Sequence, residues 1–487
     1  MQNVARFATS SLLISVASTQ VVQWDIQRRE SPVPRLNRRA DGSVQEDIIN
    51  QRMRGGYFAS CSVGTPPQNV TLQLDTGSSD IWVPASSSSI CEESQDGCTL
   101  GSYDYSSSST GKVLNGDFRI SYVDTSYSQG DYITETFGIG DVSLQNMTMG
   151  LGLDTDIAYG LVGVGYALNE ASVSRSHELY NNLPLVMRNE GHIATNAYSL
   201  WLNDLDASKG NILFGGVDTD KYMGDLIRVN IQRDSQAQNY TSFQVKLTSL
   251  EAHSSSGDDS LSSTSFPISV VLDSGTTFSY LPQDLAEEVW QEVGAEYTVV
   301  SNNGAGVPLI SCDLANSNGF FSFGFGGDGG PVIKVGMDEL VIPSGTLNGQ
   351  QVCQFGIQNF SSDPFLLGDT FLRSAYVVYD LENNEIALAP TDFNATTSKV
   401  VAFPSQGAKI PSSTPAPSQD AANSGPSSSP DFSASKGFKD LSSSGSGSGN
   451  GVDSAGSLPP ALDFTQLIVM GSSMGLVMFG GGMFLLF

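Results

Sequence analysis

The chain has 487 residues, which is long enough for a large core of two lobes with accessory segments. It carries 51 acidic and 23 basic residues, and a formal charge of −28 argues against nucleic acid as a partner. The 51 glycines and 21 prolines indicate short strands and many turns, so we expect a mostly β protein.

The first residues have the features of a secretory signal, which we expect over residues 1–18. Arg6 precedes the short apolar stretch 12–17, and small residues follow it. The arginine pairs Arg28-Arg29 and Arg38-Arg39 then suit the processing of a short propeptide over 19–39. A disordered N-terminus and a solvated, charged linker are the alternatives for these two segments.

From about Tyr57 to Thr391, short apolar runs recur between turn-forming residues, which is typical of a β-rich domain. Within this region one segment is duplicated. Residues 71–84 read TLQLDTGSSDIWVP, and residues 269–282 read SVVLDSGTTFSYLP. Each copy has a later echo, Leu-Val-Gly at 161–163 and Leu-Leu-Gly at 366–368. Such a repeat predicts two related lobes, 40–220 and 221–395.

The repeat places an aspartate after each apolar strand, at Asp75 and Asp273. A sharp turn would present both carboxyl groups side by side in a cleft between the lobes, where they would share a proton because both cannot ionise at close range. One carboxylate would then take a proton from a water while the other protonates the scissile carbonyl oxygen, so we expect peptide hydrolysis at acid pH without a covalent intermediate. The alternative is two Asx-type turns without a catalytic role. The residues expected to support the pair through tight turns and hydroxyl hydrogen bonds are Gly77, Ser78, Gly275 and Thr276.

The stretch from Tyr57 to Pro390 resembles the pepsin-like aspartic proteases. Beyond the duplicated segment, the resemblance rests on VGTPPQ at 63–68, NILFGGVD at 211–218 and FLLGDTFLRSAYVVYD at 365–380. It implies a bilobal β fold with a substrate cleft between the lobes, polypeptide substrates and no cofactor.

The resemblance also implies a flap hairpin over the cleft. Tyr122 in the segment ISY matches the flap tyrosine, and Trp82 matches the residue that its hydroxyl group faces. The alternative is that both are ordinary aromatic residues of the core. Residues 123–126 read VDTS where the family often has glycines, which leaves the mobility of the flap open.

The five cysteines and three scattered histidines make a metal site unexpected. Our preferred interpretation is two disulfides, Cys91–Cys98 and Cys312–Cys353, with Cys61 single and buried, although the sequence cannot prove this pairing. Five sequons suit a secretory route, and their asparagines are Asn69, Asn146, Asn239, Asn359 and Asn394.

Residues 396–458 are rich in Ser, Pro, Gly and Ala, and we expect an extended stalk because such a segment has little apolar surface to bury. Residues 467–487 carry no charge, and small residues around 450–456 precede them. This arrangement is typical of the signal for a glycosylphosphatidylinositol (GPI) anchor, expected over 459–487. The alternative is a retained transmembrane helix.

With this tail the chain resembles the yapsin-type fungal aspartic proteases. We therefore expect a GPI-anchored monomer on the extracellular face of the cell membrane or in the cell wall. One rival is a catalytically inactive surface protein, with a binding or wall-structural role, on a protease scaffold. A soluble digestive protease is a second rival, which residues 396–487 disfavour.

Overall fold

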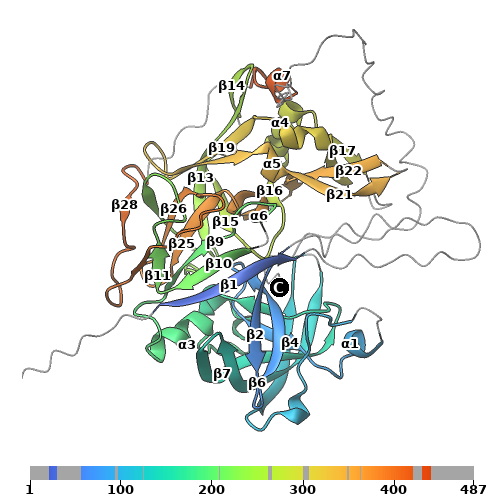
Figure 1. Cartoon of the computed structure of the whole chain (residues 1–487), viewed down its shortest axis with the longest axis vertical. Coiled ribbons are helices and arrows are strands. Elements are labelled where there is room, and N and C mark those ends of the chain that lie inside the picture. The colour runs from blue at the N-terminus through green and yellow to red at the C-terminus, as the bar shows by residue number, and fades with distance from the viewer. Residues whose placement is uncertain are drawn as a thin grey trace, which may run out of the picture.

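The computed structural model describes residues 21–29, 56–93, 97–123, 125–207, 209–261, 266–299, 306–347, 350–361, 363–419 and 430–439. Strands dominate these residues and the helices are short, so the expected mostly β fold is confirmed. Figure 1 shows two lobes, with the first half of the chain in the lower lobe and most of the second half in the upper lobe. The expected signal peptide, the pair Arg38-Arg39 and the expected anchor signal lie outside the described residues.

One sheet of 14 strands runs from the first lobe through the middle of the molecule, in the order β28-β12-β26-β25-β9-β10-β1-β2-β3-β8-β4-β7-β6-β5. Its first-lobe strands are β2 (Gly56–Val63), β3 (Gln68–Asp75), β4 (Ile81–Pro84), β5 (Lys112–Ser121), β6 (Tyr127–Ile139), β7 (Val142–Thr155) and β8 (Leu161–Gly163). Its other strands are β1 (Val22–Arg29), β9 (Ala197–Trp201), β10 (Lys209–Phe214), β12 (Leu226–Asn230), β25 (Ala375–Asp380), β26 (Glu385–Pro390) and β28 (Ser413–Pro415). The helices α1 (Ser89–Glu93), α2 (Ala171–Ser176) and α3 (Leu183–Asn189) and the 3-10 turns η2 (Tyr105–Ser107) and η3 (Ala167–Asn169) belong to the first lobe.

The second lobe contains a sheet in the order β20-β19-β13-β15-β24-β16-β23, with β14 beside β13, and a smaller sheet in the order β17-β18-β22-β21. The larger sheet consists of β13 (Gln244–Ser254), β14 (Gly257–Ser260), β15 (Ile268–Leu272), β16 (Ser279–Pro282), β19 (Phe320–Phe325), β20 (Val332–Gly336), β23 (Ile357–Phe360) and β24 (Phe365–Leu367). The smaller sheet consists of β17 (Glu296–Val299), β18 (Gly306–Ile310), β21 (Val341–Leu347) and β22 (Gln350–Phe355). The short elements α5 (Met337–Leu340), α6 (Asp369–Leu372) and η4 (Cys312–Asn316) connect these strands.

The helix α4 (Gln283–Val293) shows how the sequence directs a helix onto the second lobe. Its apolar side chains recur at helical spacing, and Leu285, Val289 and Val293 are fully buried. The helix ends at Gly294, which adopts the left-handed conformation with φ 73° that terminates many helices.

The two copies of the repeat have the same topology. β3 lies parallel to β8 and β4 antiparallel to it, while β15 lies parallel to β24 and β16 antiparallel to it. The glycine in each echo allows the loop after the aspartate to rest on the neighbouring strand. A Cβ at Gly163 would lie 2.5 Å from the Ser79 nitrogen, and one at Gly368 would collide with the Thr276 carbonyl oxygen. The predicted relationship between the lobes is thus present in the strand pairing.

The strand β1 lies within the expected propeptide. It pairs antiparallel with both β10 and β2, and its alternate residues Val22, Trp24 and Ile26 are buried. This strand therefore contributes to the core of the chain as folded here. Removal of 19–39 during maturation stays a prediction.

Part of the expected stalk is packed against the folded domain, contrary to the expectation of an extended chain. β27 (Val400–Ala402) pairs with β11 (Gly216–Asp218), and β28 pairs with β12. Phe403 and Ile410 are buried, and Phe438 in α7 (Ser435–Phe438) stacks on Phe321 at 5.4 Å between ring centroids. The average composition of 396–458 does not reveal these few apolar residues. Strand pairing also needs no particular side chain, because its hydrogen bonds use backbone groups alone. For 400–416 and 435–438 an extended stalk is therefore wrong.

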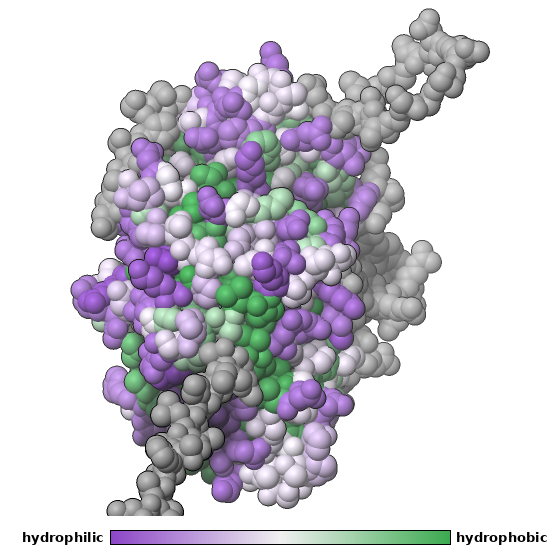
Figure 2. Space-filling view, turned by 60° about the vertical axis from the view of Figure 1, so that its left-hand side comes forward, coloured by the Kyte–Doolittle hydropathy of each residue, from purple (hydrophilic) through white to green (hydrophobic). Residues whose placement is uncertain are grey.

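Polar residues cover most of the face in Figure 2, where apolar side chains gather in a strip near the middle. None of the helices in the described ranges is both long and apolar enough to cross a membrane.

Candidate active site

The two repeated turns bring Asp75 and Asp273 together in the middle of the molecule. Both side chains are fully buried. A Cβ at Gly77 would lie 2.6 Å from Asp273 Oδ1 and 2.9 Å from its Oδ2, so the turn of one lobe lies against the aspartate of the other. Only glycine fits at this close approach. The pairing expected from the sequence is therefore what the chain adopts.

Each aspartate is held by a matching set of hydrogen bonds. Asp75 Oδ1 accepts from the Gly77 N–H at 2.8 Å, and its Oδ2 accepts from the Ser78 hydroxyl. Asp273 makes the same contacts: its Oδ1 accepts from the Gly275 N–H at 2.8 Å, and its Oδ2 accepts from the Thr276 hydroxyl at 2.6 Å. All four predicted supporting residues thus contact the carboxyl groups, and the arrangement has two-fold symmetry.

The two turns are also bound to each other by Thr76 and Ser274, for which the sequence predicted no role. The Thr76 hydroxyl donates to the Leu272 carbonyl oxygen at 2.9 Å, and the Ser274 hydroxyl donates to the Leu74 carbonyl oxygen at 3.0 Å. Each hydroxyl also accepts the backbone N–H of the other residue, at 2.9 and 3.2 Å. The sequence does contain a sign of this contact, because both copies of the repeat carry a hydroxyl residue between Asp and Gly. These bonds fix the distance between the aspartates.

The electrostatics of the pair favour a shared proton. Burial raises the pKa of Asp75 well above its usual value, and the neighbouring Asp273 raises it further, against the hydrogen bond from Ser78. Burial likewise raises the pKa of Asp273, opposed by the hydrogen bonds from Thr276 and Gly275. A pair in this state can accept a proton on one oxygen and donate one from another.

The predicted partnership of Trp82 and Tyr122 is present beside the aspartates. The Trp82 Nε1–H donates to the Tyr122 hydroxyl at 2.7 Å, within a buried cluster that includes Phe118. Tyr122 follows β5 directly, in the β5–β6 hairpin that would form the flap. Thr125 in the connecting turn has φ 68°, a conformation usual for glycine, so the turn forms without the glycines of related sequences.

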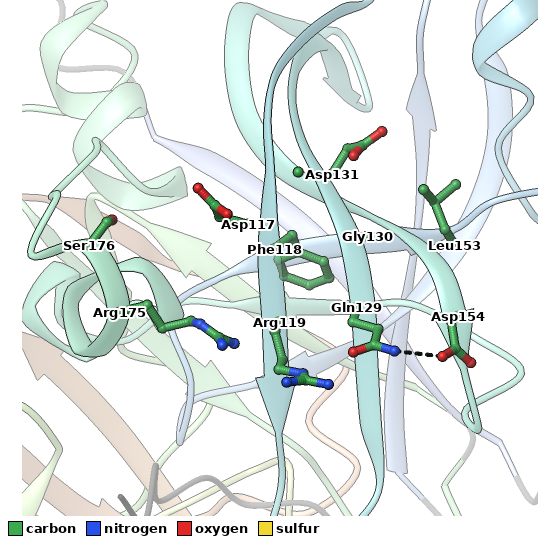
Figure 3. Close-up of a pocket in the computed structure, with 11 residues that line it drawn as sticks. Asp117, Phe118, Arg119, Gln129, Gly130, Asp131, Leu153, Asp154, Arg175 and Ser176 are labelled. Atoms are coloured by element: carbon green, nitrogen blue, oxygen red, sulfur yellow. Dashed lines mark hydrogen bonds between the residues drawn. The ribbon is translucent and has the colours of Figure 1, made fainter.

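A pocket of about 620 Å³ is lined by residues of this hairpin, of β7 and of α2. Figure 3 shows its lining residues. Arg119 and Asp131 extend from the strands of the hairpin, and Arg175 extends from α2. The lining of the pocket includes neither Asp75 nor Asp273, but it does include Phe118 from the cluster of Trp82 and Tyr122.

The expected disulfides are confirmed, since Cys91 is bonded to Cys98 and Cys312 to Cys353. Cys61 is free and buried. Of the sequon asparagines, Asn359 is half-buried and the other four are exposed, namely Asn69, Asn146, Asn239 and Asn394. Their glycosylation stays a prediction.

Comparison with known proteins agrees with this geometry. The family model described as eukaryotic aspartyl protease matches residues 56–391. The chain is 40% identical over 404 residues to the probable aspartic-type endopeptidase opsB of Aspergillus oryzae, with 81% of each chain covered. It is 36% identical to the acid protease of Saccharomycopsis fibuligera, over 74% of this chain and 88% of the relative. It is also 36% identical to secreted aspartic protease 3 of Candida albicans, over 74% of this chain and 85% of the relative. The chain therefore belongs to the eukaryotic aspartyl protease family and is an aspartic endopeptidase.

Proposed function

We propose that this endopeptidase hydrolyses polypeptides at acid pH through a water that Asp75 and Asp273 activate. The observation that carries the proposal is the symmetric set of hydrogen bonds around two buried aspartates. Two buried carboxyl groups this close do not both ionise, so the pair shares one proton. One carboxylate can then accept a proton from water while the other group protonates the carbonyl oxygen. Water attack gives a tetrahedral diol and leaves the pair with one proton. When the diol collapses, the C–N bond breaks, one carboxyl group protonates the leaving nitrogen and the other takes a proton from a diol hydroxyl, so the pair again holds one proton and no bond to the enzyme forms.

The alternative is a catalytically inactive protein on a protease scaffold, whose function would not depend on the paired aspartates. It would not require two aspartates with matched partners, or the hydrogen bond between Trp82 and Tyr122. Incubation of the purified protein with a random peptide mixture at pH 4, followed by mass spectrometry, tests the choice. We expect internal cleavage of many peptides. Intact peptides after prolonged incubation would support the scaffold instead.

We further propose that the enzyme is secreted and attached to the cell surface by a GPI anchor. The support is the sequence of the tail, in which small residues and a polar spacer precede the uncharged stretch 467–487. The packed segment 435–438 would then leave only a short tether between the second lobe and an anchor site near 450–456.

The anchor predicts how the mature protein leaves the membrane. A phosphatidylinositol-specific phospholipase should release it, because the anchor holds the chain through lipid alone. Peptide mapping of the released protein should find no residues beyond about 450–456. Peptides from 467–487 in the surface protein would instead show a retained helix.

A further inference from the structure

Gln73 is a polar side chain on the strand that carries Asp75. It precedes Asp75 by two residues, so both point to the same face of β3, whereas Leu72 and Leu74 point into the hydrophobic core. A strand rises about 3.3 Å per residue, which places Gln73 roughly 7 Å along the strand from Asp75. Its amide reaches the backbone of the turn that holds Asp273, so Gln73 lies beside both turns of the aspartate pair.

The carboxamide group of Gln73 is held at one end only. Its Nε2–H donates to the carbonyl oxygen of Gly275 on the other lobe at 3.3 Å. A Cβ at Gly56 would lie 2.8 Å from this nitrogen, so the amide rests against bare backbone. The Oε1 atom accepts no hydrogen bond from any residue that the structure describes. Oε1 is therefore a hydrogen-bond acceptor that a ligand could use, in a residue that is only 7% exposed.

The internal repeat supplies a direct comparison. Val271 precedes Asp273 by two residues, as Gln73 precedes Asp75. Val271 packs in a hydrophobic cluster with Phe278, Tyr280 and Leu366, while its neighbours Val270 and Leu272 point into the main core. The two sides of the aspartate pair therefore have the same backbone but opposite chemistry.

We propose that Gln73 is a specificity-determining residue that selects, on its side of the scissile bond, a substrate side chain able to donate a hydrogen bond. Hydroxyl, amide and ammonium groups meet this requirement. A leucine or phenylalanine at the same position would leave Oε1 buried and unpaired, which is unfavourable. The side of the bond that meets Val271 would accept apolar residues. The inference rests on the proposed function of the aspartate pair and adds the substrate class to it.

Paired peptides that differ only in Gln or Met at one flanking position test the assignment. The two residues have similar shapes and no charge, so neither size nor the charge of −28 influences the comparison. We expect the wild type to show about tenfold higher kcat/KM for the Gln peptide on one side of the cut, and to favour Met on the other side. The Gln73→Leu variant should lose or reverse the first preference. Val271→Ala serves as the matched control and should leave the Gln-to-Met ratio on the Gln73 side unchanged.

A purely structural role as a link between the lobes would lower kcat/KM equally for both peptides and leave their ratio unchanged. An unchanged ratio in Gln73→Leu, or a wild type that favours Met on both sides, would overturn the assignment. Should Gln73→Leu not fold, Gln73→Glu keeps an acceptor and should retain the Gln preference at pH 4, and its loss there would also count against the assignment. A wild type that cleaves neither peptide would overturn the proposed function itself, and this inference with it.

Discussion

Replacing Asp75 or Asp273 with asparagine is expected to lower kcat/KM by about 10⁴-fold or more without unfolding the protein. Asparagine has nearly the same shape and keeps an oxygen that can accept the N–H of Gly77 or Gly275. It cannot ionise, so the pair can no longer exchange a proton with water and substrate. The measurement is hydrolysis of a fluorogenic peptide at pH 4, with thermal unfolding as a check on the fold.

Asp104→Asn is a matched control for this substitution. Asp104 caps a 3-10 turn in the first lobe and accepts hydrogen bonds from Ser106 and Ser107, away from the aspartate pair. Its variant should keep full activity. Activity within tenfold of the wild type in Asp75→Asn or Asp273→Asn would show that the pair does not perform the chemistry.

The stability of the protein is expected to fall as the pH rises from 4.5 to 7, because two carboxyl groups, of Asp80 and Glu170, are buried at the N-terminal end of α2. Burial raises the pKa of Glu170 to about 9 and that of Asp80 to about 6. Asp80 accepts hydrogen bonds from the Tyr180 hydroxyl at 2.7 Å and the Ala171 N–H at 2.8 Å, which oppose its shift. The Glu170 Oε1 atom is buried without a partner among the described residues.

The sign of this effect follows from which state holds more protons. Above about pH 4.5, Glu170 ionises in the unfolded chain but stays protonated in the folded chain, so each pH unit lowers the free energy of unfolding by about 1.4 kcal/mol. From pH 4.5 to 7 Glu170 alone accounts for about 3 kcal/mol, and Asp80 adds to it up to pH 6. Glu170 and Asp80 therefore stabilise the fold most at acid pH, where the shared proton of the aspartate pair is also present.

Urea unfolding of Glu170→Gln at several pH values measures this contribution. Between pH 4.5 and 7 the free energy of unfolding should fall less steeply with pH in the variant than in the wild type, by about 1.4 kcal/mol per pH unit, because glutamine does not titrate. The double variant with Asp80→Asn should be flatter still below pH 6. A slope in Glu170→Gln equal to that of the wild type would show that Glu170 ionises normally in the folded protein.

The sequence was most informative where function depends on a local pattern. A strand, an aspartate, a tight turn and a hydroxyl residue are contiguous in each copy of the repeat, so the contacts of Asp75 with Gly77 and Ser78 were predictable. The hydrogen bond between Trp82 and Tyr122 joins distant segments. It was expected only from the resemblance to a family.

Other features depend on contacts between segments that no local pattern connects. Asp80 and Glu170 are about 90 residues apart, and only the folded chain shows that both are buried at the N-terminal end of α2. Phe403 and Phe438 were hidden in a segment whose average composition suggests an extended chain. The position of β1 in the central sheet was missed because arginine pairs suggested processing rather than strand pairing.

The most direct test of the aspartate mechanism is titration with a pepstatin-type inhibitor, whose hydroxyl-bearing tetrahedral carbon imitates the intermediate of water attack. Such a compound binds tightly only where two carboxyl groups share a proton around the attacking oxygen. We expect complete inhibition of peptide hydrolysis at pH 4 with one inhibitor molecule per enzyme molecule, and far weaker binding to Asp75→Asn. Hydrolysis that persists at saturating inhibitor would contradict the aspartate mechanism.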